Sequence, residues 1–487
     1  MSKLTLSKDH NPNYLAWIYR IGETTPIPKA DRLVKTTING YDIVVSKETK
    51  PGDLVAYFPV ETALSEKFLS TNNLYEMSEA HRNANFKEVE ELIKYANTAE
   101  DDYDAKQSMA MAKSMCGFFN KHGRVRMLKL RGEYSMGFLT PVSSLVNTWP
   151  ELADTDWGSL VGTSFDTVCG EEICHKYVPK TVVATNGDGQ RHWRKAMKKL
   201  KGFDRLVPDT FEFHYDTKQL GEHFDEIKPD DVVTVSVKVH GTSVIMANLP
   251  VNRQLSFWEN IKKFFGGKVA LTEWGNIYSS RKVIKNQYIN KGVGEGFYSA
   301  DVWGEVNKTF SKLLEPGMTL YGEIVGYVPG TQTFIQKNHD YGCKVGTWKF
   351  MPYRMTVATG EGKKEWNLTQ VNAWMEQMIG FHPELEDKVL PLNILYHGPI
   401  KDMYAEVPLD DNWHNNLLEK MKNDGEWLLM EKNEPMCKNK VPREGVVIRI
   451  DNDKLARAWK LKSRRHYEIS ATEYDLGIVN MEDVESN

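Results

Sequence analysis

Alternating apolar and polar positions dominate the first 150 residues of the chain. Residues 33–38 and 41–45 alternate as two strands, and Asn39-Gly40 between them is a strong signal for a two-residue type I′ turn. Further apolar runs of strand length cover residues 54–60, 125–130 and 134–139. Several short strands joined by glycine-containing turns predict a small β-barrel.

The remaining pattern divides the chain into further segments. Residues 66–120 have helical periodicity with an acidic cluster at 100–104, which predicts a helical insertion in the barrel with its acids in solvent. A turn-rich stretch at 185–190 is typical of a linker. Strands dominate again from Val232, and residues 360–440 read as a mixed, helix-containing insertion.

Composition places this chain among globular proteins. With 487 residues, of which 41% are hydrophobic and 26% charged, it can bury more than one core, which excludes disorder as a general description. No run of consecutive apolar residues approaches the length needed to span a bilayer. The first residues also lack the apolar region of a secretory signal. We therefore expect no membrane partner and a cytoplasmic or nuclear location, or the host cytoplasm for a viral protein.

The cysteines and the charge distribution add two smaller points. Five cysteines form an odd, sparse set typical of a reducing compartment, and Cys169, Cys174 and His175 lack the second ligand pair of a zinc site. The net charge of −4 does not indicate nucleic acid, but residues 191–205 interleave cationic side chains with Trp193 and Phe203. This stretch is either a phosphate-binding surface or a helix with a solvated basic side.

Lys238 stands at the end of a β-branched run, residues 231–237, that is typical of a buried strand. Burial disfavours the charged ammonium and so lowers the pKa of such a lysine, and a neutral amine is a nucleophile. The alternative for Lys238 alone is an edge lysine whose ammonium reaches solvent.

Other charges occupy similar apolar strands. Glu323 and Glu444 each lie beside glycine in a β-run, and Lys460 and Lys462 are two residues apart, so in a strand both point to one face. Because isolated charges in a core are costly, we expect these groups to converge on each other and on a charged ligand. Two carboxylates and three lysines suit a phosphate chain with a divalent metal.

Taken in order, these motifs resemble those of covalent nucleotidyltransferases, the superfamily of ligases and capping enzymes. The matching segments are Lys238-Val239-His240-Gly241, Ser280-Arg281, Tyr321-Gly322-Glu323, Glu444-Gly445-Val446-Val447 and Lys460-Leu461-Lys462. The upstream residues 211–217 and the His-Gly-Thr-Ser form of the lysine motif are similar to ATP-dependent RNA ligases with an N-terminal OB-type domain. The resemblance covers most of residues 1–60, 124–145 and 205–465.

The resemblance implies an α+β fold, with an OB-like β-barrel followed by a nucleotidyltransferase domain of antiparallel sheets with flanking helices. The implied divisions are an OB-like domain at 1–150, a connecting segment with the basic stretch at 151–204, and an adenylation domain at 205–487. Only a short tail follows Lys462, so we expect no further OB domain there, unlike in DNA ligases and capping enzymes.

The resemblance also implies roles for individual residues. Lys238 would attack the α-phosphate of ATP to give lysyl-AMP, and Lys460 with Lys462 would contact that phosphate and the leaving pyrophosphate. Glu323 and Glu444 would bind the ribose or a Mg²⁺ or Mn²⁺ ion. The other implied nucleotide contacts are His240, Gly241, Arg281 at the ribose or RNA phosphate, and Tyr353, preferred to Phe350, stacked on adenine.

His240 replaces the aspartate that is commoner in this motif. Imidazole is a poorer partner than carboxylate for a magnesium-bound water, which argues against a metal role for His240. Some RNA ligases share the histidine, so it favours an RNA ligase over a DNA ligase.

The expected function is therefore an ATP-dependent RNA ligase that joins 3′-OH and 5′-phosphate ends. We expect a monomer that acts in RNA repair on nicks in RNA duplexes or RNA/DNA hybrids. The alternatives are a DNA ligase or a GTP-dependent capping enzyme of the same superfamily, or a non-catalytic RNA-binding protein.

Overall fold

The chain forms two compact units, Met1–Tyr177 and Val178–Asn487, each considered by itself. The computed structural model describes residues 3–178, 204–286, 298, 300–360, 362–424, 429–430, 433–451 and 457–475. The linker at 185–190 and nearly all of the basic stretch at 191–205 lie outside the described residues. No helix in the described part of the chain is both long and apolar enough to cross a bilayer.

The first unit is built from short antiparallel strands around an aromatic core. Its four-stranded sheet has the order β10 (Phe138–Pro141), β6 (Leu54–Phe58), β2 (Ala16–Arg20) and β11 (Ser164–Phe165). The other strands are β1 (Leu4–Thr5), β3 (Thr24–Pro26), β4 (Leu33–Ile38), β5 (Tyr41–Ser46), β7 (Thr62–Leu64), β8 (Leu128–Leu130), β9 (Glu133–Ser135), β12 (Thr167–Val168), β13 (Glu171–Glu172) and β14 (Cys174–Lys176).

The predicted hairpin at the start of the chain is present. Strands β4 and β5 pair in register up to Ile38 and Tyr41, and Asn39 and Gly40 have φ angles of 51° and 69°. Positive φ at both central residues defines the type I′ turn that their sequence indicates. The hairpin packs through Val34 and Ile43 against Val55 and Tyr57 of β6, in a cluster separate from the main core of this unit.

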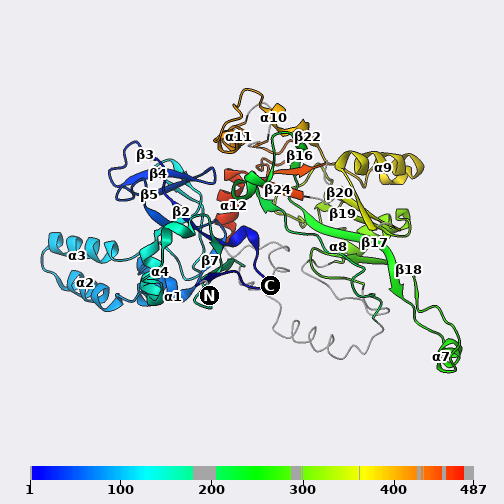
Figure 1. Cartoon of the computed structure of the whole chain (residues 1–487), viewed down its shortest axis with the longest axis horizontal. Helices are drawn as coiled ribbons and strands as arrows, with labels where there is room; N and C mark the ends of the chain where they lie inside the picture. The colour runs from blue at the N-terminus through cyan, green and yellow to red at the C-terminus, as the bar shows by residue number, and fades with distance from the viewer. Residues whose placement is uncertain are drawn as a thin grey trace. The chain divides into compact units, whose positions relative to one another are not determined.

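The helical insertion carries α1 (Glu66–Thr71), α2 (Phe86–Thr98) and α3 (Asp102–Ser114), and α4 (Val142–Thr148) follows later in the unit. Helices α2 and α3 form a hairpin that projects from the strands of this unit (Figure 1). It has only a small core of Ala80, Val89 and Ala112. The acidic cluster is exposed, and Asp101 caps α3 by accepting a hydrogen bond from the Tyr103 amide.

The first unit ends later than the predicted boundary at residue 150. Strand β11 pairs with β2, β12 with β1, and β14 with β7, so residues assigned to a connecting segment complete the sheets of this unit. These strands are two or three residues long, too short for an alternating pattern to reveal.

The second unit contains two five-stranded sheets. One has the order β15 (Lys218–Gln219), β24 (Arg457–Lys462), β23 (Gly445–Ile450), β16 (Val232–Lys238) and β22 (Ile394–Pro399). The other has the order β18 (Thr272–Ser279), β17 (Thr242–Asn252), β19 (Met318–Gly326), β20 (Trp348–Thr359) and β21 (Gly362–Trp366). All pairs are antiparallel except β15 with β24. Residues 239–241 cross directly from β16 in one sheet to β17 in the other.

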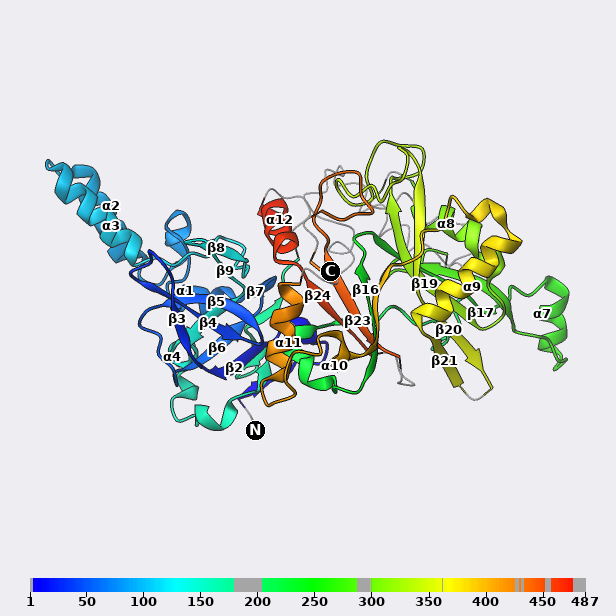
Figure 2. The ribbon, with the colours of Figure 1, turned by 90° about the horizontal axis from the view of Figure 1, so that it is seen from above.

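Helices cover one face of each sheet in the second unit (Figure 2). Helices α6 (Leu220–His223), α10 (Ile400–Met403) and α11 (Trp413–Lys422) enclose a core with β16, β23 and β24. Helices α8 (Val302–Phe310) and α9 (Leu368–Phe381) enclose another with β17, β19 and β20. Helix α7 (Phe257–Phe264) lies between β17 and β18, and α12 (Arg464–Asp475) follows β24. The predicted insertion at 360–440 includes β21 and β22, which belong to the sheets themselves.

Short 3₁₀ helices occupy several connections. They are η1 (Pro12–Tyr14), η2 (Met77–Arg82), η3 (Pro150–Leu152), η4 (Trp157–Leu160), η5 (Phe224–Glu226), η6 (Ser311–Leu313) and η7 (Pro383–Leu385).

A buried ion pair anchors the segment that leads into β23. Arg443 Nε donates to Glu434 Oε2 at 2.8 Å, and the two side chains are only 3% and 2% exposed. Removing one partner of such a pair leaves the other charge buried. Glu434→Ala should therefore lower the free energy of unfolding by about 3–5 kcal/mol, measured by urea denaturation.

The matched control is Glu384→Ala. Glu384 pairs with Lys312 at 3.3 Å, but both side chains are more than half exposed, so the loss should stay below about 1 kcal/mol. Equal losses in the two variants would contradict this account.

Candidate active site

The strand register brings the predicted lysines and carboxylate to one end of a sheet. Lys238, the last residue of β16, is opposite Gly445 on β23, and Gly445 is opposite Lys462 on β24. Glu444 immediately precedes β23, so its side chain lies between the two lysines. Lys460 is two residues before Lys462 on the same strand, which puts both on one face as the sequence predicts.

Gly445 allows these strands to approach. Its φ is +150°, and a Cβ at this position would lie 2.0 Å from the carbonyl oxygen of Leu461. A side chain would therefore force β23 and β24 apart and move Glu444 relative to the lysines.

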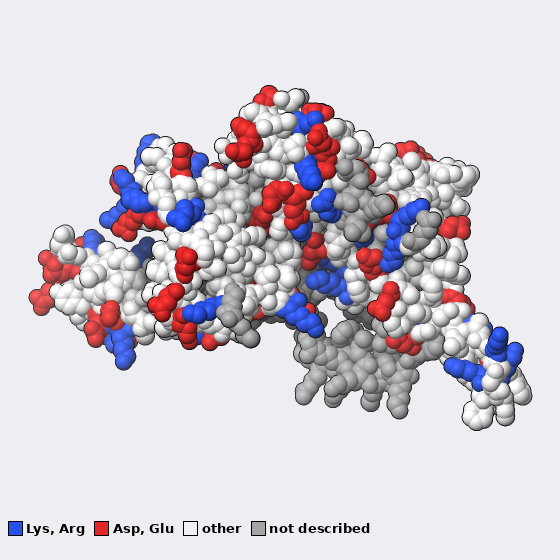
Figure 3. Space-filling model, viewed as in Figure 1, with Lys and Arg blue, Asp and Glu red and all other residues white. Residues whose placement is uncertain are grey.

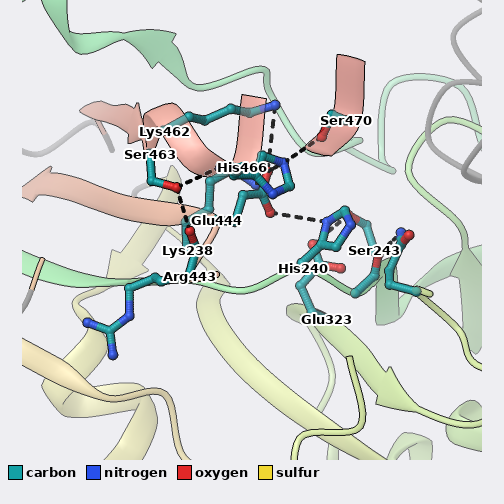
Figure 4. Close-up of polar contacts among 12 residues, drawn as sticks. Lys238, His240, Ser243, Glu323, Arg443, Glu444, Lys462, Ser463, His466 and Ser470 are labelled. Carbon is teal, nitrogen blue, oxygen red and sulfur yellow. Dashed lines mark hydrogen bonds and ion pairs between the residues drawn. The ribbon is translucent and has the colours of Figure 1, made fainter. Parts of the chain in front are cut away.

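Glu444 is the centre of the site (Figure 4). Its Oε1 lies 2.9 Å from Lys238 Nζ and 3.6 Å from Lys462 Nζ, and its side chain is only 5% exposed. Burial raises the pKa of Glu444, but Lys238, then His466 and His240, outweigh it and hold the pKa well below its ordinary value. The carboxylate is therefore charged at neutral pH. The Lys238 side chain is 20% exposed, so its amine can be reached by a ligand without lying in bulk solvent.

Two imidazoles complete the surroundings of Glu444. His240 Nδ1 lies 3.3 Å from Glu444 Oε2, and His466 Nε2 lies 3.7 Å from Oε1. Burial lowers the pKa of His466 well below its usual value, and this effect exceeds the opposing effect of Glu444. The backbone amide of His240 donates to the Tyr341 hydroxyl at 2.8 Å, which fixes the loop after Lys238.

Glu444, His240 and His466 are the described residues most suited to hold a metal. Their potential ligand atoms all lie within 4.8 Å of one another. Two imidazoles and a carboxylate form a ligand set that suits Mn²⁺ or Zn²⁺ better than Mg²⁺. The geometry therefore allows a metal role for His240 that the residue type alone disfavours, whereas Glu323 is not part of this group.

A second charged cluster surrounds Lys460. Arg281 forms an ion pair with Asp216. Burial raises the pKa of Asp216, but Arg281 and then Lys460 hold it at about 2. Burial, followed by the repulsion of Lys462, Arg281 and Lys238, lowers the pKa of Lys460 to about 7. Lys460 thus links the Arg281 cluster to the Glu444 cluster.

Glu323 contacts the loop after Lys238 from the other sheet. Ser243 on β17 is opposite Glu323 on β19, and its hydroxyl donates to Glu323 Oε1 at 2.8 Å. At Gly241 a Cβ would lie 2.6 Å from the Ile324 carbonyl oxygen and 3.1 Å from Glu323 Oε2. Glycine at this position therefore lets the loop pass directly over Glu323.

The two aromatic candidates for adenine stacking have different surroundings. Phe350 is fully buried and packs against Phe310, with ring centroids 4.8 Å apart, so its faces are not available to a ligand. Tyr353 is partly buried beside Met351 and 5.3 Å from the His214 ring. Of the two, only Tyr353 could stack on a base.

A cavity of about 740 Å³ opens next to His240 and His466. Its other lining residues include Gln336, His339 and Lys440. Gln336 also donates to the carbonyl oxygen of Gly241 at 2.6 Å, which ties the cavity wall to the Lys238 loop.

Sequence reasoning missed three residues of the site. Asp216 lies in a segment that resembles the ligases but suggested no role, and His466 follows Lys462 by four residues in the first turn of α12. Tyr341 has no sequence signal, because it reaches His240 only through the fold. His466 could have been found as the one histidine close to the last lysine motif.

Comparison with known proteins supports the fold. A family model described as an OB-fold domain matches residues 15–90. A search of curated proteins gives no match.

Three solved structures of RNA ligase variants from Naegleria gruberi resemble the chain along nearly its whole length. One with ATP and Mn is 16% identical, covers 93% of this chain and 98% of that chain, and has a TM-score of 0.52. One with AMP and Mn is 17% identical, with coverages of 93% and 98% and a TM-score of 0.51. Another with ATP and Mn is 15% identical, with coverages of 96% and 99% and a TM-score of 0.50.

These matches confirm the expected resemblance to RNA ligases at the level of the fold. The chain has an N-terminal OB-fold domain, and its second unit is an α+β module of mainly antiparallel sheets with flanking helices. At identities this low, the activity has to be argued from the site itself.

The low pKa of Lys460 predicts a pH-dependent stability. The unfolded chain holds the Lys460 proton up to about pH 10.5, whereas the folded chain releases it near pH 7. The buried ammonium of Lys460 therefore lowers the free energy of unfolding by its full amount below pH 7. This loss becomes smaller as the pH rises to 10.5. Lys460→Met should be more stable than the wild type near pH 6.5, by on the order of 2 kcal/mol, and the difference should shrink toward pH 10.

Denaturation in urea at several pH values measures this difference. Lys308→Met is the control, because the Lys308 side chain is 78% exposed, and it should show no such pH dependence. A constant difference between wild type and Lys460→Met across this range would contradict the assignment.

Proposed function

We propose that this protein is an ATP-dependent RNA ligase that joins 3′-OH and 5′-phosphate ends through lysyl-AMP and RNA-adenylate intermediates. The observation that carries the proposal is an excess of positive charge around Lys238. Four cationic side chains, Lys238, Arg281, Lys460 and Lys462, lie among the carboxylates of Asp216 and Glu444. Burial, and then the repulsion of the other cations, lowers the pKa of Lys460 to about 7, and a bound polyphosphate would offset that repulsion.

Lys238 would be the nucleophile. After its ammonium has lost a proton, the amine attacks the α-phosphorus of ATP, a P–N bond forms, and the bond to the bridging oxygen breaks as pyrophosphate leaves. Glu444 orients the amine through the 2.9 Å contact. The proton that the amine gives up passes to solvent, to which Lys238 is partly open.

The other cations would stabilise the charge that develops during this transfer. Lys460 and Lys462 would contact the α-phosphate and the departing pyrophosphate, where negative charge grows in the transition state. Arg281, held by Asp216, would contact the ribose or the 5′-phosphate of the RNA. Tyr353 would stack on adenine, and Gly241 and His240 would lie along the nucleotide.

A divalent cation, when bound, would neutralise phosphate charge and polarise the reacting phosphorus. Glu444 would hold it together with His240 and His466, whose atoms fit a single ion. Glu323, fixed by Ser243, would contact the ribose or waters of the metal. The Naegleria gruberi ligase structures with ATP or AMP and Mn support both cofactors.

In the later steps, AMP would pass from Lys238 to the RNA 5′-phosphate, and the 3′-OH would then attack this activated end and release AMP. The OB-fold unit would bind RNA by its shape and phosphates, as in sealing a nick in an RNA duplex or an RNA/DNA hybrid. These steps rest on the resemblance to RNA ligases and on the chemistry of the site.

Incubation with α-labelled ATP and Mn²⁺ or Mg²⁺, followed by a denaturing gel, tests the first step. The wild type should become labelled, and Lys238→Ala should retain less than about one thousandth of the signal because it lacks the nucleophile. Chelation of the metal should also abolish labelling. Lys308→Ala, which removes an exposed lysine, should label like the wild type.

Other outcomes of this assay would replace the proposal. Labelling by GTP but not ATP would indicate a capping enzyme, and a folded wild type that accepts neither label would indicate a non-catalytic RNA-binding protein.

Nicked duplexes that differ only in the strand at the 3′-OH side test the substrate. Because an RNA ligase contacts ribose 2′-hydroxyls, a nick with an RNA 3′-OH end should be sealed at least about tenfold faster than an all-DNA nick. Sealing is measured as the appearance of the full-length strand. Equal rates on the two nicks would remove the RNA assignment and favour a DNA ligase.

A further inference from the structure

The tip of the β17–β18 hairpin presents an unusual set of exposed aromatic side chains. Phe257, Trp258, Phe264 and Phe265 are 72%, 75%, 84% and 81% exposed, all within nine consecutive positions on and just after α7. Single exposed apolar residues are ordinary, but four large exposed rings at one tip, in contact as the pairs Phe257–Trp258 and Phe264–Phe265, indicate a binding surface.

The rings are segregated on one side of the helix. At about 100° per residue, positions 257, 258, 261, 264 and 265 fall within an arc of roughly 120°, whereas 259, 260, 262 and 263 lie outside it. The helix does not need a partner to form, because Ser256 and Glu259 make a capping box at its start. A preformed amphipathic helix therefore holds the rings outward.

Positive charge borders this apolar face. Lys262 and Lys263 lie on the helix and Lys268 follows it, while the one acid of α7, Glu259, is paired with Arg253. Figure 3 shows the result, an uncharged end with cationic side chains at its base. An apolar tip with a cationic border complements a bilayer that exposes anionic headgroups over an apolar interior.

We propose that the apolar face of α7, with Lys262, Lys263 and Lys268 beside it, docks this protein onto an anionic lipid bilayer. The rings would enter the interfacial layer, which Trp and Phe favour, and the lysines would contact lipid phosphates. The interaction is peripheral, so it is consistent with the lack of a spanning helix among the described residues. It revises the expectation of no membrane partner, which considered spanning segments only.

The segregation of rings and lysines favours a bilayer over RNA. Surfaces that bind single-stranded RNA place cations beside the stacking rings, so that bases and phosphates of one strand are contacted together. On α7 the arc of rings contains no cation. The inference is independent of the proposed ligase activity.

Vesicle flotation with the full-length protein, without ATP or RNA, tests the inference. The wild type should float with vesicles of phosphatidylcholine and phosphatidylglycerol and much less with phosphatidylcholine alone. Phe264→Ser with Phe265→Ser should reduce the bound fraction at least about tenfold, because the rings supply the buried apolar area. Lys262→Glu with Lys263→Glu should reduce it in the anionic vesicles. These side chains are exposed, so the variants should keep the wild-type fold.

Phe381→Ser is the matched control, since Phe381 is 67% exposed at the end of α9, and it should float like the wild type. The proposal is overturned if the wild type fails to float with anionic vesicles, or if the variant at positions 264 and 265 floats equally well. It is also overturned if sedimentation velocity shows a dimer that this variant loses, or if RNA alone protects Trp258 from chemical modification.

Discussion

The buried carboxylate of Glu444 imposes the main constraint on the second unit. A charge with 5% exposure is tolerated only when it is paired, and here two ammonium groups and two imidazoles from β16, β24, α12 and the Lys238 loop surround it. Each of these elements must therefore keep its position for the others to remain satisfied. The buried pair of Arg443 and Glu434 holds the residue next to Glu444, so the constraint extends to the preceding segment.

The same arrangement leaves positive charge in excess. Lys460 is the lysine that shows this, because burial and its cationic neighbours lower its pKa to about 7 while Asp216 opposes them only in part. A site of this kind lowers the stability of the folded state while it is empty, and binding of an anion restores that stability. Its preference is for a ligand with several negative charges at short spacing, which describes a nucleotide triphosphate better than a single carboxylate or phosphate.

The sequence predicts those features that depend on local pattern. Asn39-Gly40 specifies its own turn, and the spacing of Lys460 and Lys462 determines that both point to one face. Pairing Lys238 with Glu444 follows from the cost of burying charge, although the register that joins them through Gly445 is a property of the fold.

Other features arise only from tertiary packing. Strands β11 to β14 are too short to carry a period, so the end of the first unit is not visible in the pattern. Tyr341 reaches the backbone of His240 across about a hundred residues of sequence, and His466 comes close to Glu444 only because α12 starts directly after β24. The metal-binding potential of His240 likewise depends on these neighbours rather than on its own type.

The β17–β18 hairpin connects the two surfaces that we assign. Strand β17 begins at Thr242, next to the Lys238 loop, and ends at Asn252 below α7, and β18 returns to Ser279 beside Arg281. Eleven residues of extended strand span roughly 35 Å. The tip can therefore contact a flat surface while the residues around Glu444 stay about the length of β17 away from that surface. Strand β18 pairs with β17 from Ile245 to Asn252, so the hairpin would act as a rigid spacer between the tip and the residues around Glu444.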